Sequence, residues 1–460
     1  ERPEFYETLA FHFTEGRSLH KAVAYLMKSG EKSLERYSLE ESHQYFKQAF
    51  DLLNEKNEKT NEEQEMLIDL LNKWADVYYW RGHFSSMIDL FKSHEDLAES
   101  LGKKATLGMF YALLGFGLNA RDNCREADRY LQKALKIGEE TANERVIGYA
   151  CTWLALNCAL LGFLDDAVAF GTRAYETSKH IKSDQTLIIS SLRSLGFTYY
   201  VRGECQKTRN VAEDLLRYGE KQSNIRAMAM GYTYMAMSHS AAGNFALAVK
   251  SYKRAIDTSV DPMVTHSAKV MLGLSYLSQG NLDEARHVLN DVIRFSDEFG
   301  YEFIGTVGQG ALGCVFLAKG DFSRGIRIME EALRVFHDTN RRIGVARGNC
   351  MLGNFYLKLV QREGPKSLPF LARNIGFLIK NILFIGRKAE HHFNKALEVS
   401  REIGAKGVMG QACLGLGLLD KANGRNEKAR KHISQAIELF EECKAEGYLE
   451  RARETLEALN

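Results

Sequence analysis

The sequence predicts an all-α fold, a right-handed superhelical solenoid of stacked helix pairs. Proline occurs only 4 times in 460 residues, and the β-branched runs between Pro/Gly turns that strands would need are rare. Small residues recur at fixed spacings, and successive copies of the pattern begin about forty residues apart. A glycine lies between the first two small residues of most copies, where it would end one helix.

Each copy has one small residue, a second twelve residues later and a third seven residues after that. Gly115, Ala127 and Ala134 show this spacing clearly. Small side chains let two helices approach closely, so we expect these positions to mark the contacts within and between helix pairs. The turn glycines are Gly82, Gly162, Gly203, Gly243, Gly280, Gly320 and Gly424.

The pattern resembles the tetratricopeptide repeat, which has small residues at its eighth and twentieth positions and an alanine at the twenty-seventh. Its aromatic eleventh position corresponds to Tyr78, Tyr199, Tyr276, Phe316 and Tyr356. The resemblance begins at about residue 66 and departs from the family in its period, about forty residues against thirty-four. The usual proline at each repeat end is also absent. The resemblance implies a solenoid with a concave face that binds a protein or peptide.

We expect four segments along the chain. Residues 1–55 hold compressed helical repeats that share one helix at about 18–35, and residues 66–358 form the main array. Residues 359–388 are an apolar, basic helical insertion, and 389–460 hold the last repeats and a capping helix, "YLERARETLEAL". The polar stretch 54–65 is either a joint between the first two segments or an exposed helix end.

Charge and cysteine usage argue against several classes of protein. The net charge is +2 and no Lys/Arg cluster that could form a phosphate-binding stripe occurs outside residues 368–388, so no nucleic-acid partner is expected. The 8 cysteines are scattered without a CxxC pair, which indicates reduced, buried thiols in a cytoplasmic protein. No signal peptide or spanning helix is visible, and the chain begins without Met, so we expect it to be part of a larger protein.

A second resemblance concerns the two ends of the chain. The segment beginning "LAFHFTEGRSLHKAVAYLMKSG" is similar to the region that follows the ATPase module of large bacterial signalling proteins. The stretch from "AEHHFNKALEVSREIGAKG" onward resembles adenylate/guanylate cyclases with such a module and a repeat tail. This implies a non-catalytic, cyclase-linked region that couples partner or ligand binding to an upstream enzymatic domain. The alternatives are the effector-sensing domain of an ATPase-type transcription regulator and a stand-alone peptide-binding scaffold.

No catalytic residue, metal site or cofactor is predicted, so we expect this chain not to be an enzyme. "GQGALG", residues 308–313, matches a dinucleotide motif but lies inside a predicted helix, where its last glycine is a repeat packing residue. His391 and His392 are adjacent, so on a helix they point about 100° apart and make a poor metal pair.

The candidate binding residues follow from the repeat resemblance, because the concave face of that family is lined by fixed positions of each first helix. Arg193 is the only charge among these positions in the middle repeats. Either an apolar partner covers this neutral face, or tight winding buries it within the array. The candidates are Phe116, Asn119, Tyr149, Leu156, Arg193, Phe197, Tyr200, Met230, Met237, Leu274 and Leu277.

The insertion interrupts the repeat that begins at Gly353, and the pattern resumes at Ala389 after about twenty-four extra residues. It contains "LPFLARNIGFLIKNILFIGRK", which as one helix would carry an apolar row, a column of phenylalanines and a basic flank. The apolar row is Leu368, Leu371, Ile375, Leu378, Ile382 and Ile385. The candidate contact residues are Phe370, Arg373, Phe377, Lys380, Phe384 and Arg387.

Three arrangements of the insertion are open from the sequence. It could dock as a helix in the groove of its own array, with a neighbouring copy or domain covering the phenylalanines. Residues 366–388 could lie on an anionic membrane surface. The segment could also be a helix for partner binding or for homo-oligomer formation. Lys380 in mid-segment argues against a spanning helix.

Overall fold

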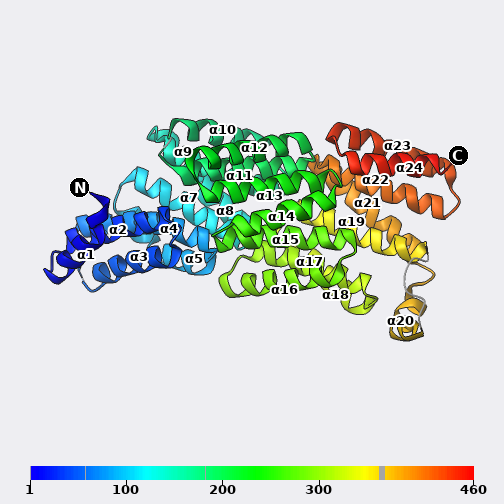
Figure 1. Ribbon diagram of the computed structural model, residues 1–460, viewed down its shortest axis with the longest axis horizontal. Coiled ribbons are helices and arrows are strands. Elements are labelled where there is room, and N and C mark those ends of the chain that lie inside the picture. Colours follow the sequence, from blue (N-terminus) through cyan, green and yellow to red (C-terminus); the bar gives the residue numbers. More distant parts are fainter. Residues whose placement is uncertain (1, 57, 182, 362–367, 460) are drawn as a thin grey trace.

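The computed structural model describes residues 2–56, 58–181, 183–361 and 368–459, with only the backbone for 368–372. In this part of the chain every regular element is a helix, as expected (Figure 1). The first half contains η1 (Pro3–Phe5), α1 (Tyr6–Glu15), α2 (Leu19–Glu35), α3 (Leu39–Asn54), α4 (Asn61–Arg81), α5 (Phe84–Lys92), α6 (Glu95–Ser100), α7 (Lys104–Ala120), α8 (Cys124–Glu140), α9 (Glu144–Leu161), α10 (Leu164–His180), α11 (Gln185–Arg202) and α12 (Cys205–Gln222).

The second half continues the same hairpins up to the C-terminal end, which lies opposite the N-terminal end (Figure 1). It contains α13 (Ile225–Ala241), α14 (Phe245–Thr258), α15 (Pro262–Gln279), α16 (Leu282–Phe299), α17 (Glu302–Ala318), α18 (Phe322–Asp338), α19 (Arg342–Val360), α20 (Leu368–Asn381), α21 (Ile385–Ile403), α22 (Lys406–Ala422), α23 (Asn426–Cys443) and α24 (Glu446–Glu457). No helix among the described residues is long and apolar enough to cross a membrane.

The N-terminal segment begins with three helices that pack in series. Helix α2 packs against both α1 and α3, so one helix serves two units. Thr60 begins α4 with a capping box, in which its side chain and that of Glu63 each accept a backbone N–H of the other residue. Within the polar stretch 54–65, the described residues from Asn61 onward therefore belong to α4, and residue 57 lies outside the described part.

The small residues lie where the two helices of a hairpin touch. A Cβ added to Gly115 would meet Leu131 at 2.7 Å, one added to Gly273 would meet Leu289 at 2.6 Å, and one added to Gly417 would meet Ile433 at 2.5 Å. In each case the partner lies sixteen residues later in the chain. These glycines let the backbones approach until the partner side chain fills the space that a Cβ would take.

The same contact shows where the insertion begins and ends. A Cβ on Gly353 would meet Phe393, which lies forty rather than sixteen residues later. The difference is the twenty-four residues expected from the sequence. Helix α21 therefore takes the place of the second helix, packed against α19, and the hairpin is completed around the insertion.

Two further expectations concern individual residue types. Residues 308–313 lie in the middle of α17, and Gly313 packs against Met329, as a repeat glycine should. All eight cysteines are free, and Cys314 is the only one not fully buried. Burial raises the pKa of Cys151 and of Cys350 to about 12, so these thiols stay protonated and unreactive.

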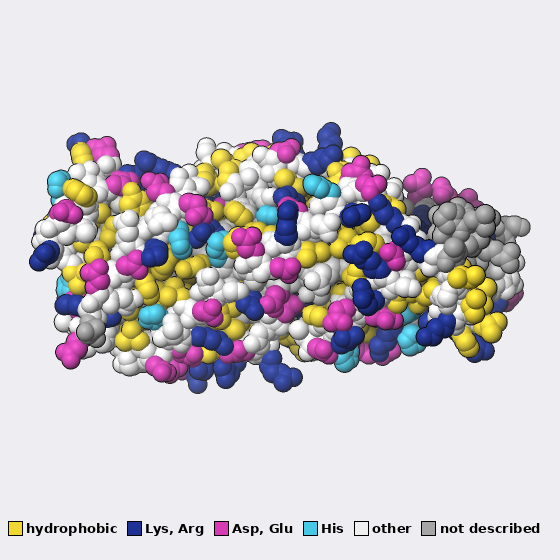
Figure 2. Space-filling view, turned by 90° about the horizontal axis from the view of Figure 1, so that it is seen from below, with side chains coloured by type: hydrophobic (Ala, Val, Ile, Leu, Met, Phe, Trp, Pro, Cys, Tyr) yellow, Lys and Arg dark blue, Asp and Glu magenta, His cyan; other side chains and the backbone are white. Residues whose placement is uncertain are grey.

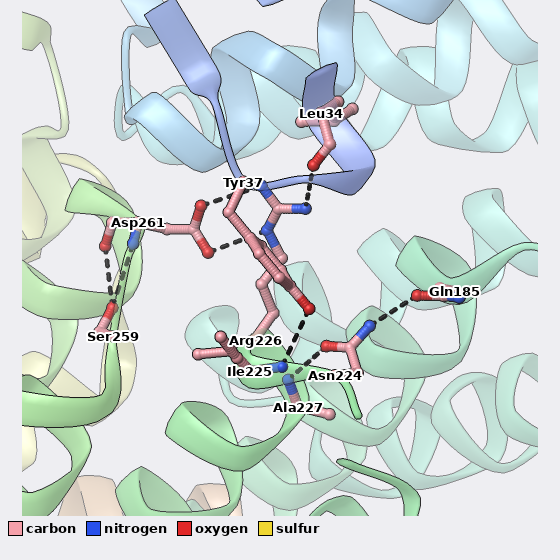
Figure 3. Close-up of polar contacts among 9 residues, drawn as sticks. All are labelled: Leu34, Tyr37, Gln185, Asn224, Ile225, Arg226, Ala227, Ser259 and Asp261. Atoms are coloured by element: carbon pink, nitrogen blue, oxygen red, sulfur yellow. Dashed lines mark hydrogen bonds and ion pairs between the residues drawn. The ribbon is translucent and has the colours of Figure 1, made fainter. Parts of the chain in front are cut away.

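Successive turns of the superhelix touch one another directly. At the N-terminal end, Arg226 of α13 donates to the Leu34 carbonyl of α2 at 3.0 Å, and the N–H of Ile225 donates to the Tyr37 hydroxyl at 3.0 Å (Figure 3). At the C-terminal end, the N–H of Gly447 donates to the Ala242 carbonyl at 2.9 Å. We call this line of contacts between turns the inter-turn seam.

In the middle of the inter-turn seam, the contacts are made by residues in the short connections between helices. Arg341 forms a buried ion pair with Asp122, and it donates to the Asn119 carbonyl at 2.8 Å. Farther along, the turn at Gly203 lies against Gly407 at the start of α22. The array is thus a closed coil, in which successive superhelical turns touch. This tight winding buries part of the inner face, which is one of the two alternatives left open by the sequence.

Replacing Gly203 by alanine is expected to cost about 1–3 kcal/mol more unfolding free energy than replacing Gly280. Both glycines have the left-handed φ that alanine disfavours, +84° and +81°. A Cβ at Gly203 would lie 2.7 Å from the Gly407 backbone nitrogen, whereas one at Gly280 meets nothing within 4 Å. Urea unfolding of the two variants, followed by circular dichroism, measures the difference. Equal losses would show that the seam does not contribute at this point.

Candidate functional site

The candidate residues of the inner face fall into two groups in the structure. The first group lies toward the N-terminal end, where the inner face is filled by its own side chains. Phe116 stacks on Trp153 with ring centroids 4.0 Å apart, and Tyr79 packs against both rings. The inner face is therefore buried at this level of the array, which is the second of the two alternatives left open by the sequence.

Three other members of the first group are buried with polar or packing roles. Asn119 donates to the Asn157 side chain at 2.8 Å, and Leu156 is 7% exposed beside it. Together with Phe116 they line a small cavity of about 40 Å³. Tyr149 is 1% exposed, and its hydroxyl donates to Asp184 at 3.1 Å. These residues stabilise the coil and do not offer a binding surface.

The second group lines a larger cavity of about 310 Å³ inside the superhelix. Its mouth includes the exposed residues Ser278 and Asn354. Seven predicted residues lie in its wall, namely Arg193, Phe197, Tyr200, Met230, Met237, Leu274 and Leu277. They come from the first helices α11, α13 and α15, as the repeat positions predict. These seven residues form one side of this cavity.

The opposite side of the cavity comes from the next superhelical turn. Helices α17 to α19, α22 and α24 contribute to it, with Met329, Phe336, Arg347, Val408 and Tyr448 among the lining residues. None of these five residues was among the candidates chosen from the sequence. They were missed because closure of the coil depends on the helix-pair angle, which the repeat spacing does not specify.

Among the described residues, three arginines and no Asp, Glu or Lys line the cavity wall. Arg193 lies between two tyrosine hydroxyls, 3.5 Å from that of Tyr79 and 3.4 Å from that of Tyr301. Arg347 donates to the Tyr200 hydroxyl at 2.9 Å, and its guanidinium carbon lies 4.4 Å from the centre of that ring. Neither arginine forms an ion pair with a described residue.

The third arginine, Arg341, already has an acidic partner in the Asp122 carboxylate. Its guanidinium also lies 4.7 Å from the Phe303 ring. Burial raises the pKa of Asp122 to about 6, and the neighbouring Arg341 opposes this rise. Arg193 and Arg347 are therefore the two cations that an anionic ligand in the cavity could pair with.

The described part of the insertion does not lie in this cavity, so it does not adopt the first of the three arrangements left open by the sequence. None of residues 373–388 lines the cavity, and α20 packs against α18 and projects from the body (Figure 1). Asn374 donates to the Gly320 carbonyl at 2.7 Å, and Phe377 packs on Phe322 and Phe355. Residues 362–367 and the Phe370 side chain lie outside the described part.

The insertion is also not one continuous helix. Helix α20 ends at Asn381, and a turn over residues 382–384 separates it from α21. The residues of the predicted apolar row therefore do not share one face. Ile375 and Ile382 are exposed, whereas Ile385 is buried. The predicted basic residues Arg373, Lys380 and Arg387 are all exposed, and Phe384 is 48% exposed.

In the described part of the chain, no group of three or more His, Cys, Asp or Glu side chains is placed to bind a metal ion. His391 is exposed, and the Nδ1–H of the half-buried His392 donates a hydrogen bond to the Asn349 Oδ1 at 2.9 Å. Burial lowers the pKa of His392 to about 4, so it is neutral and structural.

Comparison with known proteins supports the repeat architecture. The tetratricopeptide repeat family model matches residues 235–298, from α13 to α16. No match is found among curated proteins. Similar solved structures include a Rap protein complexed with competence and sporulation factor, with 12% identity, a TM-score of 0.45, and coverage of 89% of this chain and 99% of that chain. Another is NprR in complex with its cognate peptide NprX, with 12% identity, a TM-score of 0.49, and coverage of 78% and 99%.

Proposed function

We propose that this chain is a non-catalytic, effector-sensing repeat region whose cavity binds an apolar ligand with one acidic group, such as a short peptide with a free carboxyl terminus. The observation that supports it is the cavity wall, whose described residues are apolar apart from hydroxyls, amides and three arginines and include no acid. Ligand sites are concave and mostly apolar, with a few convergent polar groups and volumes of about 300–1,000 Å³.

The arginines favour a carboxylate over a neutral group. Arg193 and Arg347 are held by hydroxyls and ring faces, which orient a guanidinium but do not neutralise it. A cation that is removed from water gains most from an anion that it can bind through two hydrogen bonds. A ligand carboxylate near Arg347 would supply this partner while its apolar part meets Met237 and Leu274.

The position of the cavity suits a sensor. Its walls come from two successive superhelical turns, so a ligand that fills it contacts both and changes how they stack. In a repeat array such a change passes from neighbour to neighbour. The comparisons give no support to the cyclase link that the sequence resemblance implies, so the proposal follows the alternative, the sensing region of a regulator.

The proposal predicts that short apolar peptides with a free carboxyl terminus bind, and that the same peptides amidated at this end bind at least about 10-fold more weakly. Arg347→Gln should weaken binding of the free peptides to a similar extent, because a hydrogen bond to a charged group contributes about 1.5–3 kcal/mol. Fluorescence anisotropy of labelled peptides measures the dissociation constants.

Two further variants locate the binding site. Leu274→Trp extends a side chain into the cavity and should abolish binding. Arg324→Gln is the matched control, because Arg324 is exposed and lies over Phe316 outside the cavity. If Leu274→Trp binds as the unaltered chain does, or if no apolar peptide binds, the proposal is wrong.

A further inference from the structure

Helix α20 is held to the body along one side only. Asn374 is 2% exposed, and it accepts from the N–H of Phe322 at 3.3 Å in addition to its bond to Gly320. Phe377 and Asn381 lie on the same side, and Lys388 of α21 donates to the Asn381 side chain at 2.7 Å. These contacts fix the rotation of the helix, so its other side faces away from the array.

The outer side of α20 and the turn after it, residues 382–384, carry a dense group of exposed hydrophobic residues. Ten large hydrophobic side chains are exposed in the described part of the chain, and five of them lie between residues 375 and 384. Their exposed fractions are 57% for Ile375, 72% for Ile379, 63% for Ile382, 83% for Leu383 and 48% for Phe384. A patch of this kind on a projecting element is typical of an interaction surface.

A basic edge runs beside this hydrophobic edge. Arg373 and Lys380 are exposed, and at 100° per residue they lie on the far side of the exposed Gly376 from Ile375 and Ile379. Arg387 extends the basic edge into α21. Helix α20 is the lowest element in Figure 1, and Figure 2, seen from below, shows yellow hydrophobic and dark blue basic side chains together at that end.

The charge of the segment identifies the partner that it fits. From Gly364 to Ala389 the sequence has no acidic residue, and none of Arg373, Lys380 and Arg387 forms an ion pair with a described residue. A second copy of the chain would place this same surface against itself, because a two-fold interface is self-complementary. Cations would then face cations without an acid between them.

We infer that the outer side of α20 binds an anionic lipid bilayer as an interfacial helix. Ile379 and Leu383 would enter the boundary between headgroups and acyl chains, and Arg373, Lys380 and Arg387 would meet the lipid phosphates. Anionic lipid attracts basic residues near the surface, whereas a neutral bilayer offers only the hydrophobic contribution. The inference is independent of the cavity ligand, because no described side chain of α20 lines the cavity.

The test uses the full chain with vesicles of phosphatidylcholine alone and of phosphatidylcholine with phosphatidylglycerol, separated by flotation. The chain should bind the anionic vesicles, bind the neutral ones much more weakly, and be released as salt increases. The triple variant Arg373→Gln, Lys380→Gln, Arg387→Gln should bind anionic vesicles about fivefold more weakly for each charge removed.

The hydrophobic contribution is tested by Ile379→Asp with Leu383→Asp, which should remove binding. Leu247→Asp is the matched control, because Leu247 is 51% exposed on α14 and far from the patch in sequence. All these positions are exposed, so circular dichroism should be unchanged. Equal binding to both vesicle types, binding retained by the double variant, or a dimer in sedimentation that Ile379→Asp dissociates would each overturn the inference.

Discussion

Replacing Arg226 by methionine is expected to lower the free energy of unfolding by about 3–5 kcal/mol, because it leaves a buried carboxylate without a cation. Arg226 holds Asp261 through two hydrogen bonds, of 2.9 and 3.1 Å, and the two residues are 7% and 1% exposed. The same guanidinium reaches the Leu34 carbonyl across the inter-turn seam (Figure 3). Urea unfolding measures the loss.

The loss should depend on pH in a defined direction. Burial raises the pKa of Asp261 and Arg226 opposes the rise, so the pKa should be higher still in the variant. Between the unfolded and folded pKa values the folded state binds more protons, and stability therefore falls as pH rises through this range. The variant should thus recover stability as the pH is lowered toward the pKa of an unfolded-state aspartate, about 3.9.

Two comparisons distinguish the buried pair from a general effect of charge removal. Arg217→Met removes an exposed arginine that pairs with Asp214 at 3.0 Å, and it should cost less than about 1 kcal/mol. Adding Asp261→Asn to Arg226→Met should recover part of the loss, because a neutral amide is less costly to bury. A loss for Arg226→Met as small as for Arg217→Met would contradict the prediction.

Replacing Phe393 by alanine is expected to cost about 3–5 kcal/mol, as truncation of a fully buried aromatic residue usually does. Phe393 is 0% exposed, and its ring lies between Gly353 of α19 and Gly415 of α22. The two glycines leave a space that the ring fills and that alanine would leave empty. Removal of the ring should therefore loosen the repeat that surrounds the insertion.

Phe163→Ala is the matched control, because Phe163 is 56% exposed between α9 and α10. It should change the free energy of unfolding by less than about 0.5 kcal/mol. Hydrogen exchange would then show whether α19, α21 and α22 are the helices that lose protection in Phe393→Ala. Equal losses in the two variants would argue that α21 does not complete the interrupted hairpin.

The sequence was sufficient to predict the helix pairs, because each depends on contacts between residues close in the chain. The sixteen-residue distance from Gly115 to Leu131 is a local property, and it even located the twenty-four extra residues before Phe393. The glycine spacing also excluded a nucleotide site at residues 308–313, which the structure places within α17.

The cavity was only half predicted, because its second wall comes from far along the chain. Tyr200 and Arg347 are 147 residues apart and meet only after the coil has closed. The same closure buries Phe116 and Tyr149, which a more open coil would have exposed. The orientation of α20 was missed for a different reason: the buried side is selected by Asn374 and Asn381, whose polar side chains satisfy backbone groups of neighbouring turns or of their own helix.

The inter-turn seam determines how the superhelix can respond to force, because its adjacent turns are already in contact. Adjacent turns touch where Arg226 meets Leu34, where Gly203 meets Gly407 and where Gly447 meets Ala242. The superhelix therefore cannot become shorter along its axis. A pulling force, or a group inserted inside the superhelix, can therefore only extend or unwind it. Extension breaks discrete hydrogen bonds, and the response should therefore be a sudden yield at a threshold force and not a gradual stretch.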